Sequence, residues 1–236
     1  ERRDATDVTA ISIQQGQALK AKQPPASKDW EPPARLIWKA LRTSTFTATY
    51  EATDWAIAYS TMHVLSAYYA NERRNGELLT TIAANFDELL LTEGARRRLR
   101  IETEPRETPV KPPTASKDWH PNAKRIWNAA RDTPAITRYY EPTDWAVLHF
   151  VTSELSRLFE TDYPSGKLKA TLDSIMSNLM LTEGTRRRLD LELGTAQSAQ
   201  LGKTAGELEA DRLYAEMSSY LQGVTDASVT SDTSDA

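Results

Sequence analysis

The sequence contains no cysteine, which excludes disulfide bonds, thiol catalysis and cysteine-based metal sites. It contains no run of about 18 apolar residues, so we expect no membrane span and no membrane partner. Only three histidines occur, and no spacing brings two of them onto one helical face beside a carboxylate. Glycine-rich phosphate loops, nucleophile elbows and paired-carboxylate motifs are also absent. We therefore expect a protein that is not an enzyme and that uses neither a cofactor nor a metal.

The chain also lacks a large excess of either charge. Its net charge is −4, and residues 24–102 carry ten basic and ten acidic side chains. Residues 113–193 carry eleven of each, whereas residues 194–236 carry two basic and seven acidic side chains. This balance excludes a generally basic nucleic-acid-binding surface, but it is compatible with a local basic patch.

What the sequence does contain is a tandem duplication. The segment 91–99, Leu-Thr-Glu-Gly-Ala-Arg-Arg-Arg-Leu, returns at 181–189 with one substitution, and Tyr-Glu-x-Thr-Asp-Trp-Ala occurs at both 50–56 and 140–146. A repeat of this length predicts two small domains. We expect a flexible N-terminal arm at 1–27, repeat 1 at 28–102, a proline-rich linker at 103–112, repeat 2 at 113–193, a linker and amphipathic helix at 194–222, and a disordered acidic tail at 223–236.

Each repeat shows helical periodicity and no sustained alternation typical of strands. A first helix should start at Pro32 and a longer one after Tyr50, where Asp54 suits the first turn. A third should start near Glu77, and Thr92 can cap a short fourth helix. The fold class that we predict is all-α, with two tandem bundles of about four helices each, a C-terminal amphipathic helix and disordered termini. The residues expected to face inward on the long helix of repeat 2 are Trp145, Leu148, Thr152, Leu155 and Phe159.

Tryptophan occupies the same three places in each repeat. Trp38 and Trp55 lie on apolar helical stripes, which favours packing in the core over stacking with unpaired bases. Trp30 precedes a helix in a polar segment, so for this residue both interpretations are open.

The two arginine triplets are the most informative polar motif. Consecutive helical residues are rotated by about 100°, so three arginines in a row cannot share one face. At least one should point inward or sideways, where Glu51, Asp54 or Glu93 would pair with it. The others would reach solvent and contact DNA phosphates or a neighbouring subunit. Arginine at all six positions indicates fork-shaped hydrogen bonding, which suits both salt bridges and phosphate recognition.

The order of the repeated motifs carries a resemblance to a known family. Trp-x-Pro-x-Ala, then Tyr-Glu-x-Thr-Asp-Trp-Ala, then Leu-Thr-Glu-Gly-x-Arg-Arg-Arg-Leu resembles the small terminase subunit of tailed bacteriophages that infect actinobacteria. The resemblance covers about residues 28–102 and 117–193. The duplication departs from the family, in which a single unit is usual.

The resemblance implies a role in packaging viral DNA. A protein of this kind would bind the packaging site of the double-stranded phage genome as a homo-oligomer, expected to be a ring, in the host cytoplasm. It would also recruit or regulate the large terminase subunit, which holds the ATPase and nuclease. The DNA-binding candidates are Arg96, Arg97, Arg98, Arg100, Arg186, Arg187, Arg188, Lys124, Arg125 and Arg131. The candidates for contact with the large subunit are Leu208, Leu213, Met217, Tyr220 and Leu221, on a helix expected at 204–221.

An alternative from another functional class remains open at this point. In it the chain is a non-enzymatic scaffold or adaptor that binds only proteins, and its arginines form internal ion pairs. DNA contact requires the exposed arginines of both repeats to gather on a common face, whereas burial of the arginines against carboxylates favours the adaptor.

Overall fold

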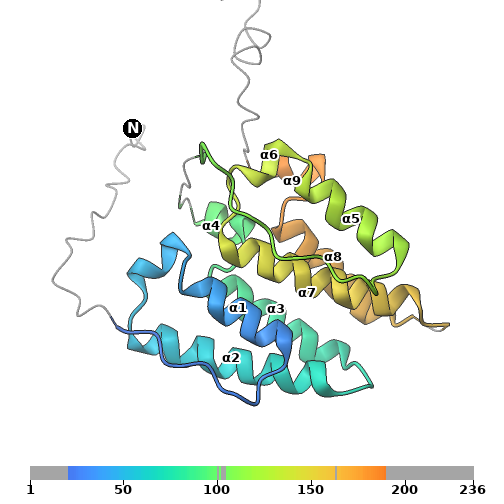
Figure 1. Cartoon of the computed structure of the whole chain (residues 1–236), viewed down its shortest axis with the longest axis horizontal. Coiled ribbons are helices and arrows are strands. Elements are labelled where there is room, and N and C mark those ends of the chain that lie inside the picture. The colour runs from blue at the N-terminus through green and yellow to red at the C-terminus, as the bar shows by residue number, and fades with distance from the viewer. Residues whose placement is uncertain (1–20, 100, 102–104, 163, 190–236) are drawn as a thin grey trace, which may run out of the picture. The chain divides into compact units, whose positions relative to one another are not determined.

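A computed structural model describes residues 21–99, 101, 105–162 and 164–189. Every regular element in these ranges is a helix, which confirms the all-α prediction (Figure 1). The predicted helix at 204–221 and most of both expected flexible termini lie outside the described residues. Repeat 1 comprises α1 (Pro32–Leu41), the 3-10 helix η1 (Thr45–Thr49), α2 (Ala52–Ala70), α3 (Gly76–Glu88) and α4 (Glu93–Arg98). Repeat 2 comprises α5 (Pro121–Arg131), α6 (Pro134–Thr137), α7 (Pro142–Phe159), α8 (Gly166–Asn178) and α9 (Glu183–Arg188).

The helices begin where the repeated motifs place capping groups. Asp54 Oδ2 accepts a hydrogen bond from the backbone N–H of Glu51 at 2.7 Å, and Asp144 accepts the same bond from Glu141. These bonds form half of a capping box and satisfy an amide at the start of α2 and α7. Thr92 caps α4 by accepting from the N–H of Ala95, as the sequence predicted.

The tryptophans form the centre of each bundle. Trp38 makes edge-to-face contacts with Trp30 and Trp55, at centroid distances of 5.4 and 5.7 Å. Repeat 2 reproduces this arrangement with Trp119, Trp127 and Trp145. All six rings are buried, so core packing is the correct interpretation, for Trp30 as well.

Helix α7 joins the two repeats. It packs on α5 and α8 of its own repeat and also on α1 of repeat 1, so nearly all of its sides are buried (Figure 1). The predicted stripe is buried from Trp145 to Leu155, but the prediction for Phe159 was wrong. Phe159 is the last residue of α7 and is 37% exposed, because the helix ends there beyond the packed core.

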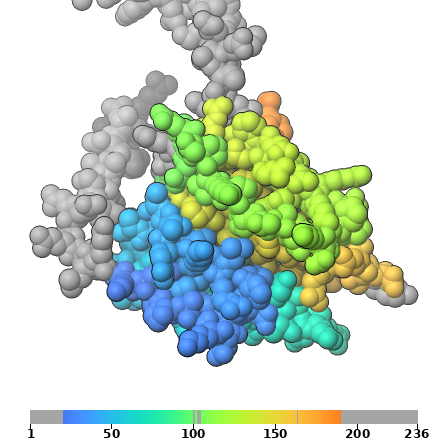
Figure 2. Space-filling model, in the orientation of Figure 1, coloured from blue at the N-terminus to red at the C-terminus, as the bar shows by residue number. Residues whose placement is uncertain are grey.

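A second contact between the repeats runs along α3 and α8. The hydroxyl groups of Thr80 and Thr171 are 2.9 Å apart, and Asn178 donates to Asp87 Oδ1 at 2.7 Å. Buried residues of both repeats form one continuous hydrophobic cluster. In Figure 2 the atoms of repeat 1, coloured blue to cyan, lie directly against those of repeat 2. Repeat 1 therefore supplies part of the core of repeat 2.

Candidate functional site

The arginine triplet of repeat 1 lies at the contact between the repeats. The side chain of Arg96 is 1% exposed and donates to Glu93 Oε2 from Nε at 3.1 Å and from Nη2 at 2.9 Å. Its Nη2 also bonds Asp144 Oδ2 of repeat 2 at 2.5 Å. Asp144 in turn accepts from the backbone N–H of Glu93 through Oδ1 at 2.6 Å. One buried carboxylate thus connects the start of α4 to the start of α7.

Burial sets the protonation behaviour of this cluster. Loss of hydration raises the pKa of Glu93 to about 7, although the charges of Arg96 and Arg97 oppose the shift. Burial likewise raises the pKa of Asp144, against the opposing effect of Arg96. Desolvation alone would lower the pKa of Arg96, but the two carboxylates outweigh it and raise the pKa.

Arg96 is therefore an internal ion-pair residue and is unavailable to a phosphate, which corrects its assignment as a DNA contact. The sequence anticipated an inward arginine and Glu93 as one partner. Asp144 was one of the carboxylates considered as partners, with Glu51, Asp54 and Glu141. Its pairing with an arginine of the other repeat was not predicted, because only the packing of the two repeats brings it close to Arg96. For Arg96 the structure thus matches the internal-pair interpretation.

The other two arginines of this triplet are less enclosed. Arg97 is 17% exposed, pairs with Glu93 Oε1 at 2.9 Å and lies over the ring of Tyr139. Arg98 is 43% exposed and pairs with Asp87 at 3.2 Å. Arg100, also a predicted DNA contact, lies outside the described residues.

The triplet of repeat 2 is at the surface. Arg186 pairs with Glu183 at 3.0 Å and retains 15% exposure, while Arg187 also pairs with Glu183 but is 80% exposed. Arg188 is exposed and donates to the carbonyl oxygen of Gly184. The pairing with arginines lowers the pKa of the exposed Glu183, the opposite of the shift at the matching Glu93. Identical motifs therefore have different environments in the two repeats.

The predicted cations of α5 are also accessible. Arg125 is exposed, and Arg131 is exposed beside Asp132, with which it pairs at 3.0 Å. Lys124 is half-buried and donates to the carbonyl oxygen of Lys117 at 2.6 Å. The structure thus brings one basic segment of repeat 2 to the surface on α5 and another on α9.

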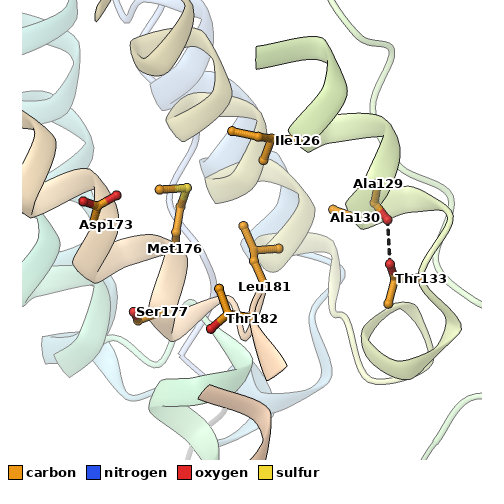
Figure 3. A pocket seen from close by; sticks show the side chains of 9 residues that line it. All are labelled: Ile126, Ala129, Ala130, Thr133, Asp173, Met176, Ser177, Leu181 and Thr182. Atoms are coloured by element: carbon orange, nitrogen blue, oxygen red, sulfur yellow. Dashed lines mark hydrogen bonds between the residues drawn. The ribbon is translucent and has the colours of Figure 1, made fainter. Parts of the chain in front are cut away.

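A groove of about 470 Å³ lies between α5, α8 and the residues that lead into α9, and the sequence did not predict it. Figure 3 shows the side chains of Ile126, Met176 and Leu181 gathered in this space, and the hydrogen bond from Thr133 to the carbonyl oxygen of Ala129 at its edge. The groove becomes apparent when the two folded repeats are compared, because the same positions in repeat 1 face a packing partner. The full lining is Ile126, Ala129, Ala130, Thr133, Asp173, Met176, Ser177, Leu181 and Thr182.

Other kinds of site are not found in the described part of the chain. No group of three or more potential metal ligands is present among these residues. None of the helices described is long and apolar enough to span a bilayer. The predicted partner-binding residues Leu208, Leu213, Met217, Tyr220 and Leu221 lie outside the described ranges.

Comparison with known proteins places both repeats in one family. The sequence model of the family described as "Phage terminase small subunit" matches residues 1–109 and again 102–218. The chain belongs to this family. It is also similar to the Gene 5 proteins of Mycobacterium phages D29 and L5, each 34% identical over 88 residues that cover 35% of this chain and 56% of the relative. The chain thus matches little more than half the length of these relatives, and no solved structure matches it.

The two family matches confirm the resemblance noted from the motifs. They also confirm that this small terminase subunit is a tandem form, because the same family model matches twice along the chain. The mycobacteriophage relatives agree with the expectation of a phage that infects actinobacteria.

Proposed function

We propose that this small terminase subunit binds double-stranded phage DNA at the packaging site as a homo-oligomer, and that it recruits or regulates the large terminase subunit without catalysing a reaction itself. The observation that carries the proposal is the match of both repeats to the small-subunit family. It would act in the cytoplasm of the host, where packaging takes place.

The exposed cations of repeat 2 are the proposed DNA contacts. Lys124, Arg125 and Arg131 lie on α5, and Arg187 and Arg188 lie on α9. Arginine and lysine at such positions neutralise phosphates and release counterions, so the affinity would fall steeply with salt. Because each repeat is nearly neutral overall, one chain would contribute few phosphate contacts, and an oligomer would multiply them.

The first test removes the α5 cations. In the full chain, replacement of Lys124, Arg125 and Arg131 by Gln should weaken binding to duplex DNA. It should also reduce the slope of log K against log[salt] by about 2–3 per chain bound, because each cation that pairs with a phosphate contributes about 0.9 to that slope. Binding would be followed by fluorescence anisotropy at several salt concentrations.

A matched variant controls for the change in net charge. Replacement of Lys28, Arg73 and Lys111 by Gln removes the same charge from exposed positions that share no helix with the α5 cations. It should leave the salt slope close to that of the wild type. If both triple variants lowered the slope equally, the α5 assignment would be wrong.

A further inference from the structure

The two repeats fold alike, but only repeat 1 has its groove filled. Ser44 and Thr133 are each the N-cap of a short helix, and each hydroxyl donates to the backbone carbonyl four residues earlier. They therefore occupy matching positions. Most residues of repeat 1 that match the groove lining are buried, whereas most of the lining in repeat 2 is partly or fully exposed. The buried set in repeat 1 includes Ile37, Ala40, Leu41, Ser44, Phe86, Leu91 and Thr92.

Helix α7 fills the groove of repeat 1. It packs along α1, the hydroxyls of Ser44 and Thr143 are 3.4 Å apart, and the rings of Phe86 and Phe150 meet edge to face at 6.3 Å. On the same side of α7, Val147 is completely buried. Repeat 1 thus uses its groove to hold a helix of the following repeat.

Among the described residues, no helix covers the matching face of α2 in this way. Ile57 occupies the position that Val147 has in repeat 2, and its side chain is 54% exposed. In the long helices α2 and α7, the other exposed large apolar side chain is Phe159, which is 37% exposed. Thr53, which matches Thr143, is exposed as well. The chain therefore presents an open groove on repeat 2 and an open helix face on repeat 1 that correspond to the two halves of its own internal contact.

We propose that the groove of repeat 2 receives the exposed face of α2 from a second copy of this chain, in the arrangement by which the groove of repeat 1 holds α7. Such a contact joins different surfaces, so each copy could accept one neighbour and be accepted by another. This contact follows from the comparison of the two repeats, and it would supply the assembly surface that the proposed function requires.

Two polar contacts between the repeats also have charged counterparts. Asp54 matches Asp144 and is half-buried. Its Oδ2 atom accepts a hydrogen bond from the backbone N–H of Glu51. In the proposed contact Asp54 would meet Arg186 of the second copy, as Asp144 meets Arg96. Opposite charges thus lie at matching positions on the two surfaces.

A second charge pair lies at the α3 end of the contact. Arg98 donates to Asn178 Oδ1 of repeat 2 at 2.6 Å. The counterparts are Arg188 and the exposed Glu88, so the proposed contact replaces a charge–amide bond by an ion pair. Arg98 is 43% exposed although it takes part in the internal contact. Arg188, which matches Arg98, should therefore also stay accessible to DNA when it takes part in the contact between copies.

Other bonds of the internal contact have no counterpart. Pro134 lacks both the N–H and the hydroxyl group with which Thr45 binds Glu141. The bonds of Glu154 to Arg74 and Tyr68 are also missing, because the matching residues are Val64, Pro164 and Leu158.

Glycine shows the difference between the two surfaces most sharply. A Cβ added to Gly94 would lie 2.5 Å from the carbonyl oxygen of Asn178, so only glycine allows α4 to approach α8 this closely. A Cβ added to Gly184 would meet no atom within 4 Å. In the proposed contact Gly184 would face the backbone of Glu88 in the second copy, where a methyl group would clash as it would at Gly94.

Gly184→Ala therefore separates assembly from folding. The methyl group has open space in the single chain, and alanine favours a helix more than glycine does, so the folded chain should be at least as stable as the wild type. We expect the full-length wild type to self-associate as its concentration rises in light scattering without DNA. Gly184→Ala and Ile57→Asp should each weaken this association at least about tenfold.

Leu99→Asp is the control for surface polarity. Leu99 is 65% exposed, more than Ile57, but it lies neither in the groove nor on α2. The Leu99→Asp variant should therefore self-associate like the wild type. Wild type that stays at the 26.5 kDa of one chain at every concentration, or Gly184→Ala and Ile57→Asp proteins that assemble like wild type, would overturn the proposal.

Cysteine pairing tests the register directly, because the natural chain has no cysteine to interfere. Within one chain, the hydroxyl oxygens of Ser44 and Thr143 are 3.4 Å apart. Thr133 matches Ser44 and Thr53 matches Thr143, so Thr133→Cys of one copy should lie beside Thr53→Cys of another. Mild oxidation of the double variant should yield disulfide-linked multimers, whereas Thr53→Cys with Asp118→Cys, an exposed site outside the groove, should not.

If the protein were monomeric and Thr133→Cys were also closed to a small thiol reagent, a segment of the same chain would cover the groove. That outcome too would overturn the proposal. The measurements use no DNA, so their failure is distinct from a failure of DNA binding.

Discussion

At the scale of single residues, the same side chain behaves differently in the two repeats because its surroundings differ. Glu93 and Glu183 each pair with two arginines of their own triplet. Glu93 also lies against Asp144 in a buried site, which raises its pKa, whereas Glu183 is exposed and has a lowered pKa. Sequence identity at a position therefore does not imply the same electrostatic role.

This difference predicts how stability depends on pH. The pKa of Glu93 rises from an ordinary 4.5 to about 7 on folding, so between these values the folded chain binds more protons than the unfolded chain. The contribution of Glu93 to the free energy of unfolding is therefore fully present below pH 4.5 and is lost as the pH rises through 7. Glu93→Gln should reduce this decline in urea unfolding curves measured between about pH 5 and 8.

Glu183→Gln is the matched comparison. Because the pKa of Glu183 is lowered on folding, its contribution is present above the ordinary pKa and is lost on acidification. Its replacement should leave the decline between about pH 5 and 8 in place. A decline that persisted unchanged in Glu93→Gln would show that burial of Glu93 is not its source.

At the scale of elements, the sequence predicted the helices well and their burial only in part. Proline, threonine and aspartate caps with helical periodicity located the starts of α1, α2 and α4, because these signals are local. They did not reveal that α7 is buried on nearly all sides, since its second buried face depends on contact with α1 of the other repeat. The inward prediction succeeded for Trp145 and failed at Phe159, where α7 ends beyond the packed core.

The candidate site was predictable to a similar extent. The triplets and the pairing of an inward arginine with Glu93 follow from helical geometry, but the role of Asp144 and the groove depend on tertiary packing. One usable signal was present: the copies keep an aliphatic residue at Ile57 and Val147, although Ile57 is exposed in the single chain.

The packing of α4 on α8 gives a prediction at this scale. Gly94→Ala places a Cβ 2.5 Å from a backbone oxygen, so α4 must shift, and we expect a loss of about 1–3 kcal/mol in the free energy of unfolding. Gly184→Ala, with open space around its Cβ, should lose nothing. Urea unfolding at low protein concentration, where self-association does not contribute, measures both. Equal stabilities for the two variants would contradict the close approach at Gly94.

At the scale of the whole molecule, assembly and DNA binding place different demands on repeat 2. The groove and the start of α9 serve the proposed contact between copies. The α5 cations Lys124 and Arg131 match Arg35 and Arg42, which stay exposed although α7 packs on α1. The α5 cations would therefore stay accessible in an assembly. This arrangement allows an oligomer to present a repeated set of phosphate contacts.

Avidity then predicts that loss of self-association weakens DNA binding, whereas loss of the DNA contacts leaves self-association unchanged. Gly184→Ala leaves every α5 cation in place, yet by separating the copies it should weaken binding to a long duplex by about 10²-fold or more, the gain that linked weak contacts provide. The α5 triple variant should lose DNA affinity while its self-association stays like that of the wild type. Anisotropy on long and short duplexes, with light scattering on the same samples, measures both properties. A monomeric Gly184→Ala protein that bound long DNA as tightly as wild type would show that a single chain holds the whole DNA site, because only a single-chain site is indifferent to the loss of its neighbours.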